Sequence, residues 1–159
     1  MVKVNISLQR TDSGNQDFQQ LVRQLDTDLG IRDGNDHSFY AQFNKIDAIR
    51  HVVVAFDQEH PVGCGAIKQY DDNTMEVKRM FVPVERRGQG IASLVLQELE
   101  KWCKELNFQR CILETGKRQP EAISLYQKNN YRIIPNFGQY KGVENSVCFE
   151  KIFDLQKVS

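Results

Sequence analysis

Hydrophobic residues follow two different periods along this chain. Alternating or continuous apolar runs of strand length predict strands at residues 4–10, 51–57, 62–70, 75–82, 110–115, 131–135 and 146–153. Apolar residues three and four positions apart predict helices within 11–30, 91–106 and 120–130, with a weaker pattern at 39–47. Strands and helices in this order predict one domain with a mixed α/β sheet and helices on its faces.

Local signals set the expected helix ends. The first helix has cap candidates at residues 11–13 and is expected to stop at Gly30. Pro120 suits the first turn of the last helix, and Asn129 with Asn130 is expected to end it, because asparagine tolerates the left-handed conformation.

Charge and hydropathy exclude several classes of protein. The chain of 159 residues has 21 basic and 21 acidic side chains, and its basic residues are scattered, so a nucleic-acid partner is not expected. The longest apolar run, residues 52–56, is far too short to span a membrane, and the first ten residues lack the apolar core of a signal peptide. We therefore expect a soluble, cytoplasmic protein without a membrane partner.

The cysteines and histidines give no metal pattern. The cysteines fall far apart in apolar segments, which favours buried reduced thiols over a disulfide framework. They are Cys64, Cys103, Cys111 and Cys148. None of the three histidines has a partner at ligand spacing, so no metal site is expected.

The stretch RRGQGIA, residues 86–92, connects a predicted strand to a predicted helix. The first N–H groups of a helix are unpaired, and its dipole is positive at that end. Gly88 and Gly90 remove side chains that would keep a ligand from the backbone, and two arginines precede them. Such a loop suits a phosphate or a diphosphate.

Two common phosphate loops do not match. The loop lacks the lysine of a Walker motif, and it follows the fourth predicted strand rather than the first strand of a dinucleotide-binding unit. By spacing alone, it could equally be a helix-entry loop with no ligand.

Longer segments carry a more specific signal. Residues 75–100, MEVKRMFVPVERRGQGIASLVLQELE, closely resemble motif A of the GNAT superfamily of acyl-CoA N-acyltransferases. Arg87, Gly90 and Ala92 match its loop pattern of Arg or Gln, two variable residues, Gly, a variable residue, and Gly or Ala. Residues 113–142 and 146–151 are similar to motif B and the C-terminal strands, although Asn130 stands where the family usually has glycine.

The resemblance implies a fold and a cofactor. The fold is a mixed, mostly antiparallel central sheet of six to seven strands, with helices on both faces, splayed at its central parallel strands. The co-substrate is acetyl-CoA, its diphosphate held by loop amides and its pantetheine arm paired with the preceding strand. The residues implied to bind it are Met80, Phe81, Val82, Arg87, Gly88, Gln89, Gly90, Ile91, Ala92, Gln119 and Tyr126.

The resemblance also implies catalytic roles. Tyr126 matches the general acid that protonates the departing thiolate, though it also lies on the apolar face of its helix and could be a core tyrosine. Glu76 matches a catalytic base in some members, but ordered water could serve instead and Glu76 could face solvent. A backbone N–H near Phe81 or Val82 would stabilise the oxyanion. Thr115 could line the pocket or cap the following helix, and a cysteine nucleophile is disfavoured.

The acceptor is less defined. In this family it contacts the first helices and the C-terminal hairpin, here residues 31–47 and 135–146, whose aromatic and acidic side chains suit an amine but equally a packed loop. They are Asp33, Asp36, His37, Phe39, Tyr40, Phe43, Phe137 and Tyr140. The expected activity is transfer of an acetyl group from acetyl-CoA to a primary amine of a small molecule, peptide or protein, by a monomer or homodimer. A non-catalytic acyl-CoA sensor and a dimerising scaffold are the alternatives.

Overall fold

A computed structural model of the chain describes residues 5–33 and 48–153. Its strands are β1 (Ile6–Thr11), β2 (His51–Asp57), β3 (His60–Asp71), β4 (Thr74–Phe81), β5 (Arg110–Gly116), β6 (Arg132–Ile134) and β7 (Ser146–Ile152). Its α-helices are α1 (Gln16–Asp33), α3 (Ile91–Glu105) and α4 (Pro120–Lys128), with 3₁₀ turns η2 (Val84–Arg86) and η3 (Gly138–Tyr140).

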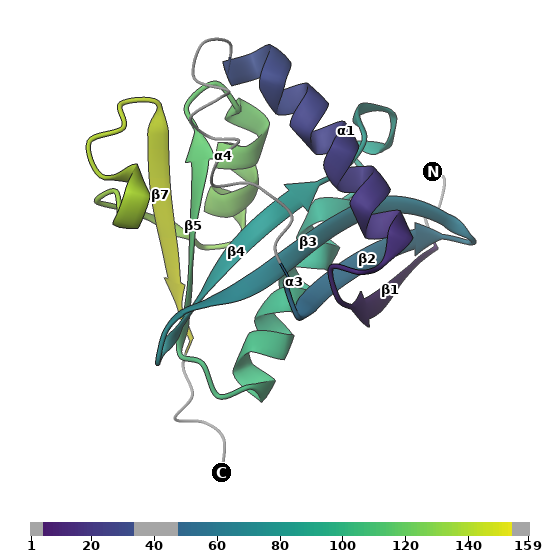
Figure 1. Ribbon diagram of the computed structural model, residues 1–159, viewed down its shortest axis with the longest axis horizontal. Coiled ribbons are helices and arrows are strands. Elements are labelled where there is room, and N and C mark those ends of the chain that lie inside the picture. Colours follow the sequence, from purple (N-terminus) through teal and green to yellow (C-terminus); the bar gives the residue numbers. More distant parts are fainter. Residues whose placement is uncertain (1–4, 34–47, 154–159) are drawn as a thin grey trace.

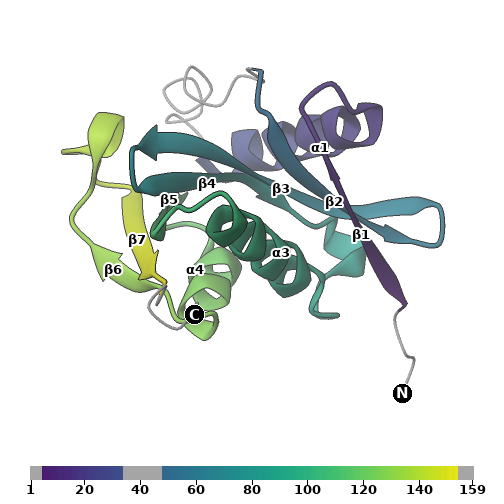
Figure 2. The same cartoon turned by 90° about the horizontal axis from the view of Figure 1, so that it is seen from below.

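The strands form one seven-stranded sheet in the order β1-β2-β3-β4-β5-β7-β6. In the part of the chain that the structure describes, β4 and β5 run parallel and the other neighbouring pairs are antiparallel. Helix α1 covers one face of the sheet, and α3 and α4 cover the other (Figures 1 and 2). This arrangement confirms the expected mixed, mostly antiparallel sheet with helices on both faces.

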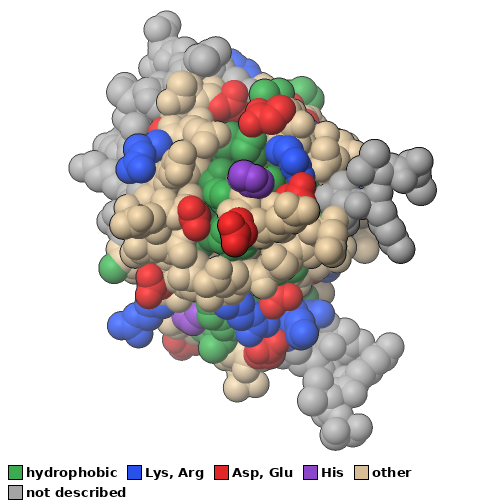
Figure 3. Space-filling view, turned by 90° about the vertical axis from the view of Figure 1, so that its right-hand side faces the viewer, with side chains coloured by type: hydrophobic (Ala, Val, Ile, Leu, Met, Phe, Trp, Pro, Cys, Tyr) green, Lys and Arg blue, Asp and Glu red, His purple; other side chains and the backbone are tan. Residues whose placement is uncertain are grey.

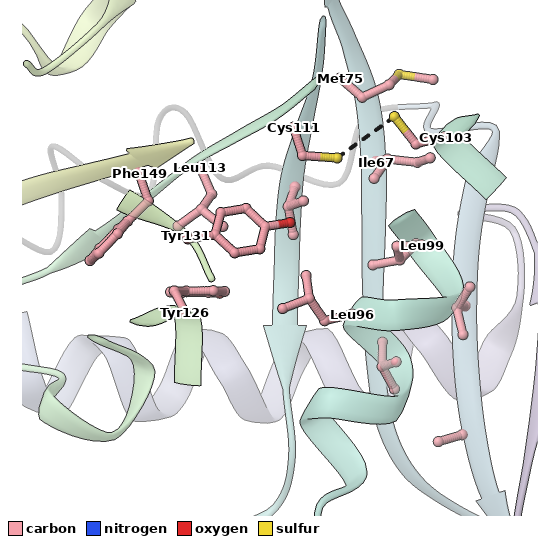
Figure 4. Packing of buried hydrophobic residues seen from close by; sticks show 14 of the residues in the cluster. Ile67, Met75, Leu96, Leu99, Cys103, Cys111, Leu113, Tyr126, Tyr131 and Phe149 are labelled. Carbon is pink, nitrogen blue, oxygen red and sulfur yellow. Dashed lines mark hydrogen bonds between the residues drawn. The ribbon is translucent and has the colours of Figure 1, made fainter. Parts of the chain in front are cut away.

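Two hydrophobic layers hold the helices on the sheet. Beneath α1, the buried residues Phe18, Leu21, Val22 and Leu25 follow the helical spacing seen in the sequence. Burying one such side chain contributes about 1.5–3 kcal/mol. On the other face, α3 and α4 pack over a larger layer that includes Tyr126, part of which is drawn in Figure 4. Strand β2 lies between β1 and β3, and its run of apolar side chains contributes to both hydrophobic layers.

Helix α1 differs from its expected limits at both ends. Its cap is Asn15, whose Oδ1 accepts a hydrogen bond from the Phe18 N–H at 2.9 Å, because residues up to Thr11 extend β1 and the chain then turns. The helix continues past Gly30 to Asp33. A single glycine destabilises a helix by only about 1 kcal/mol, which is too little to end one that is packed on a sheet. The helix predicted at residues 39–47 lies outside the described residues.

Helix α4 ends at the two asparagines, as predicted. Its geometry also explains why Asn130 can stand where the family usually has glycine. Asn129 caps the helix, and Asn130 adopts φ 70°. Asparagine is tolerated at this left-handed position, where the family usually has glycine. The Asn129 amide also donates to Ser93 Oγ at 3.1 Å, which ties α4 to α3.

All four cysteines are buried and free, as expected. Cys103 on α3 and Cys111 on β5 place their sulfur atoms 3.7 Å apart in the core (Figure 4). Burial raises the pKa of the Cys64 thiol to about 12 and that of the Cys148 thiol to about 11, so both stay protonated at neutral pH.

The distribution of charge on the surface and the hydropathy of the helices are consistent with the amino-acid composition. On the face shown in Figure 3, acidic and basic side chains are interspersed, and neither sign forms a continuous patch. Among the described residues, no helix combines the length and the apolar character needed to cross a membrane.

Strand β4 leaves its parallel neighbour early. It pairs with β5 only from Thr74 to Glu76, opposite Arg110 to Ile112. Beyond Glu76 the two strands separate, as the family resemblance implied.

A bulge in β4 accompanies this separation. Opposite β3, the register moves from the Ala66–Lys78 pair to the Cys64–Phe81 pair, which places three steps of β4 against two of β3. Within this interval Arg79 has φ 61°, a left-handed conformation that is uncommon outside glycine. The extra residue reverses the alternation of side chains for the rest of the strand.

Gly65 lies opposite the bulge and gives a test of this packing. A Cβ added there would lie 2.4 Å from Met80 Sδ, 2.9 Å from Leu99 Cδ1 and 3.0 Å from Val95 Cγ1. Because these side chains fill the layer beneath α3, we expect Gly65→Ala to lower the free energy of unfolding by about 1–3 kcal/mol. Urea denaturation of the variant and of wild type measures this difference in the free energy of unfolding. Exposed Gly14→Ala is the control and should stay within about 0.5 kcal/mol of wild type; equal stability of both variants would contradict the packing.

Candidate active site

A cavity of about 340 Å³ lies where β4 has separated from β5. The end of β4, the glycine loop, the start of α3 and one side of α4 line it. The predicted cofactor residues found in its wall are Met80, Phe81, Val82, Arg87, Gly88, Gly90, Ile91, Ala92, Gln119 and Tyr126. Gln89 is exposed and is not part of the wall. The structure therefore brings together ten of the eleven residues that the resemblance implied.

The glycine loop needs its glycines for backbone conformation. Gly88 has φ 82° and Gly90 has φ 80°, and a Cβ at either position would meet nothing within 4 Å. Gly90 is the N-cap of α3 and, lacking a side chain, provides no cap hydrogen bond. The first N–H groups of α3 thus lie at the cavity without a side-chain acceptor, as anion binding requires.

The two loop arginines line the same cavity but differ in their contacts. Arg86 donates from Nη2 to the Asp57 carboxylate at the end of β2. Arg87 donates from Nε to the carbonyl oxygen of Val82 at 2.8 Å, and its guanidinium lies over the Phe81 ring. Arg86 is thus anchored to the β2–β3 hairpin, whereas Arg87 is held against the end of β4.

A second, smaller cavity of about 100 Å³ adjoins the first on the side of α1. The two share Leu25, Met80, Gln119, Ala122 and Tyr126. Tyr126 therefore stands at the junction, with the glycine loop on one side and a more polar chamber on the other. Besides the shared Gln119, the polar residues of that chamber are Glu76, Lys78, Arg79, Glu114, Thr115 and Tyr140.

Tyr126 belongs to both the core and the site. Its side chain is buried and makes aromatic contacts with Tyr131 and Phe149, each with ring centroids 5.8 Å apart (Figure 4). Burial and, secondarily, the charge of Glu114 raise the pKa of its hydroxyl, so it stays protonated at neutral pH. The two interpretations of Tyr126 from the sequence are compatible.

Glu76 lines the smaller cavity and does not face solvent, since only 9% of the residue is exposed. Burial raises the pKa of its carboxyl group, and the nearby ammonium of Lys78, at 3.6 Å, opposes that rise. A carboxylate with a raised pKa accepts a proton more readily than one in water.

The end of β5 completes the wall. Glu114 accepts a hydrogen bond from Ser146 Oγ at 2.6 Å. Thr115 is buried and lines the smaller cavity, while Gln119 is the N-cap residue of α4, so the capping interpretation of Thr115 was wrong. Cys111 and Cys148 are in neither wall, in agreement with the disfavoured cysteine mechanism.

The acceptor segments are described only in part. Residues 34–47, with four predicted aromatic or imidazole side chains, lie outside the described residues, as do the side chains of 30–33. In the C-terminal segment Tyr140 is buried and lines the smaller cavity, whereas Phe137 packs between Tyr70 and Tyr140. Tyr140 thus fits the pocket interpretation and Phe137 the packed-loop interpretation.

Sequence reasoning missed several residues of the cavity walls, and Leu25 and Arg79 show why. Leu25 of α1 lines both cavities, although its helical spacing indicated only a core position. Arg79 belongs to the wall of the smaller cavity, with its guanidinium nitrogens buried, and its backbone φ of 61° leaves no signal in the sequence. Among the described residues, no group of three or more His, Cys, Asp or Glu is placed to hold a metal ion.

Comparisons with known proteins agree with this geometry. The model of the GNAT acetyltransferase family matches residues 18–131. An IAA acetyltransferase from Azospirillum brasilense is 31% identical over 150 residues, covering 92% of this chain and 97% of the relative. The chain therefore belongs to the GNAT acetyltransferase family. It is an acyl-CoA-dependent N-acetyltransferase.

Solved structures show the same fold. A protein from Klebsiella pneumoniae assigned as an acyl-CoA N-acyltransferase has a TM-score of 0.78 at 24% identity, covering 94% of this chain and 99% of that one. PaiA N-acetyltransferase from Thermoplasma acidophilum, solved with coenzyme A, has a TM-score of 0.70 at 17% identity over 94% and 99% of the two chains.

The buried carboxyl group of Glu76 predicts a pH-dependent stability. Its pKa is higher in the folded than in the unfolded chain, so its contribution to the free energy of unfolding falls as pH rises from the unfolded towards the folded pKa. Glu76→Gln removes this titration. We expect the free energy of unfolding of the variant, relative to wild type, to increase between pH 4 and pH 7.5. Urea denaturation of both proteins at the two pH values measures it, and a relative stability that fell over this interval would contradict it.

Proposed function

We propose that the protein transfers an acetyl group directly from acetyl-CoA to a primary amine while both are bound. The observation that carries this proposal is Tyr126, which stands between the uncapped start of α3 and a chamber containing Glu76. A donor held in the larger cavity and an acceptor in the smaller one would meet at this residue. The solved structures of family members with coenzyme A and with acetyl-CoA bound support the choice of donor.

The walls of the larger cavity fit the donor. The amides of residues 87–92 would bind the diphosphate, with the exposed Gln89 contributing its peptide N–H between two glycines. Beyond Glu76, β4 has no pairing with β5, so the backbone from Met80 to Val82 would pair with the pantetheine arm. Gln119, at the junction of the cavities, would contact the acyl end.

Acyl transfer needs a base, an oxyanion site and an acid. Glu76 would accept the amine proton, directly or through water, so that the nitrogen can form a bond to the thioester carbon. The N–H of Phe81 or Val82 would stabilise the charge that develops on the carbonyl oxygen. As the carbon–sulfur bond breaks, Tyr126 would donate its proton to the sulfur. The buried setting that raises the pKa of Tyr126 also raises the basicity of a thiolate formed there, which keeps the proton transfer matched.

We propose that the enzyme works in the cytoplasm as a monomer or homodimer, on an amine of a small molecule, peptide or protein, without a nucleic-acid or membrane partner. The relatives give no support to the alternative of a non-catalytic sensor.

Gly90→Ala tests the cradle for the diphosphate. An alanine at φ 80° strains the backbone, and its methyl group would occupy the open space at the start of α3. We expect acetyl-CoA affinity, measured by isothermal titration calorimetry, to fall at least tenfold. Gly142→Ala is a matched control, since Gly142 has φ 78°, an equally open surrounding and no place in either cavity wall. Equal affinity losses in both variants would show that only strain is involved.

Tyr126→Phe tests the general acid. The ring and its packing remain, so we expect acetyl-CoA affinity to be kept and kcat to fall by about 10²-fold or more. Tyr131→Phe is the control, because this buried tyrosine donates to Glu100 at 2.9 Å and lies in neither cavity wall. Thiol release during acetylation measures turnover. An unchanged kcat in Tyr126→Phe would refute the assignment.

The reaction itself is tested with a panel of primary amines. Acetyl-CoA should raise the thermal unfolding temperature, and at 100 times its dissociation constant it adds about 2.7 kcal/mol to stability. At least one class of amine should then give thiol release that depends on both substrates. Stabilisation by acetyl-CoA without turnover of any amine would instead indicate a sensor.

A further inference from the structure

A largely buried ion pair lies in the wall of the smaller cavity. Lys78 Nζ is 3.6 Å from Oε2 of Glu76, and the two side chains are only 13% and 12% exposed. Both residues line the cavity. An ammonium group held beside the proposed base bears directly on the reaction, an inference that rests on the proposed function.

The pleat of β4 places the two side chains on one face. Met75 and Val77 pack in the layer beneath α3, so Glu76 and Lys78, which alternate with them, face the α1 side of the sheet. The register with β3 is regular from Glu76 to Lys78 and shifts only beyond Lys78. Glu76 is the last residue of β4 that pairs with β5. The carboxylate and the ammonium group therefore lie side by side where the strands part.

The burial of Glu76 opposes its proposed role. A carboxyl group must be ionised before it can accept a proton from an amine. Burial raises the pKa of Glu76 and so favours the protonated form, which cannot act as a base. The Lys78 ammonium group favours the ionised form and lowers the same pKa. Lys78 thus counteracts the effect of burial on the proposed base.

Other charged and titratable groups surround Glu76. Lys68 of β3 is exposed and pairs with Glu76 across the sheet, and it also lowers the pKa of Glu76, although less than Lys78 does. On the α1 side, Asp26 forms an ion pair with Arg79. The groups on β4, β5, α4, η3 and β7 that line the same cavity or interact electrostatically with Glu76 are Arg79, Glu114, Tyr126, Tyr140 and Cys148. Of the cations on β3 and β4, Lys78 has the largest effect on the Glu76 carboxyl group.

We propose that Lys78 is a positioning residue for Glu76, and that its ammonium group keeps the carboxylate ionised and oriented in the chamber at neutral pH. The acceptor amine then transfers its proton to a Glu76 oxygen as the nitrogen attacks the thioester carbon. Because the ion pair forms again when Glu76 is ionised, Lys78 also favours release of that proton to water before the next turnover.

The pH dependence of the rate tests this role. Lys78→Gln removes the positive charge, and an opposite charge within about 4–6 Å lowers a carboxyl pKa by about 1–3 units. We therefore expect the acid limb of the kcat/KM profile to move to higher pH. The ratio of variant to wild-type kcat/KM should fall about tenfold from the alkaline to the acid end. This ratio cancels the ionisation of the amine itself. Thiol release from acetyl-CoA measures it, with putrescine, phenethylamine and lysine as trial acceptors and the fastest used throughout.

A carbon NMR titration follows the same ionisation without substrates. The signal of the Glu76 carboxyl carbon is assigned by its absence in Glu76→Gln. Its midpoint should rise in Lys78→Gln and in Lys78→Met, which keeps the aliphatic stem, and should return towards wild type in Lys78→Arg. Whichever uncharged variant folds decides the result. Lys68→Gln is the matched control, because it removes an ammonium group directly across from Glu76, and it should move the midpoint less than half as far.

The outcomes separate the two proposals. An unchanged midpoint, or equal movement in Lys78→Gln and Lys68→Gln, would overturn the inference, as would a loss of activity that is the same at every pH. Movement of the midpoint without movement of the acid limb would show that Glu76 is not the base, which overturns the inference while acetyl transfer to amines stands. Lack of turnover with every amine would overturn the proposed function and the inference with it.

Discussion

The whole site depends on how briefly β4 pairs with β5. The two strands share a ladder only from Thr74 to Glu76, so the rest of β4 has backbone groups that its parallel neighbour does not use. A buried strand end is stable only if its polar backbone groups find partners. Leaving that edge open within a sheet creates a place where an extended ligand can pair, with the start of α3 at one end and Tyr126 beside it.

The catalytic roles that we propose fall on side chains that also build the core. Tyr126 packs against Tyr131 and Phe149 and also stands between the two cavities. Met80 packs against the layer beneath α3 and lines both cavities. Such residues are held in position by the core, which gives the site its precision. The burial of Glu76 has the opposite effect on stability, because a charge withdrawn from water destabilises the fold while making the carboxylate a better base.

Hydrophobic periodicity predicted the existence and type of each β-strand and α-helix among the described residues, although β6 is mostly exposed and the 3₁₀ turns η2 and η3 were not expected. The resemblance to motif A identified the glycine loop as a cofactor site, the similarity to motif B added Tyr126, and the structure brings both to one cavity. The errors have local causes. Asn15 caps α1 because β1 runs further than its alternation indicated, and Gly30 is overridden by the packing of α1 on the sheet. The bulge at Arg79 has no sequence signal, since neither of its neighbours is a glycine or a proline.

The short shared ladder also divides the sheet into two wings. Strands β1 to β4 form one continuous hydrogen-bonded unit, and β5, β7 and β6 form the other. Three residue pairs form the seam between them, compared with seven between β5 and β7. The position of one wing relative to the other therefore depends largely on side-chain packing in the layer beneath α3, which contains residues of both wings.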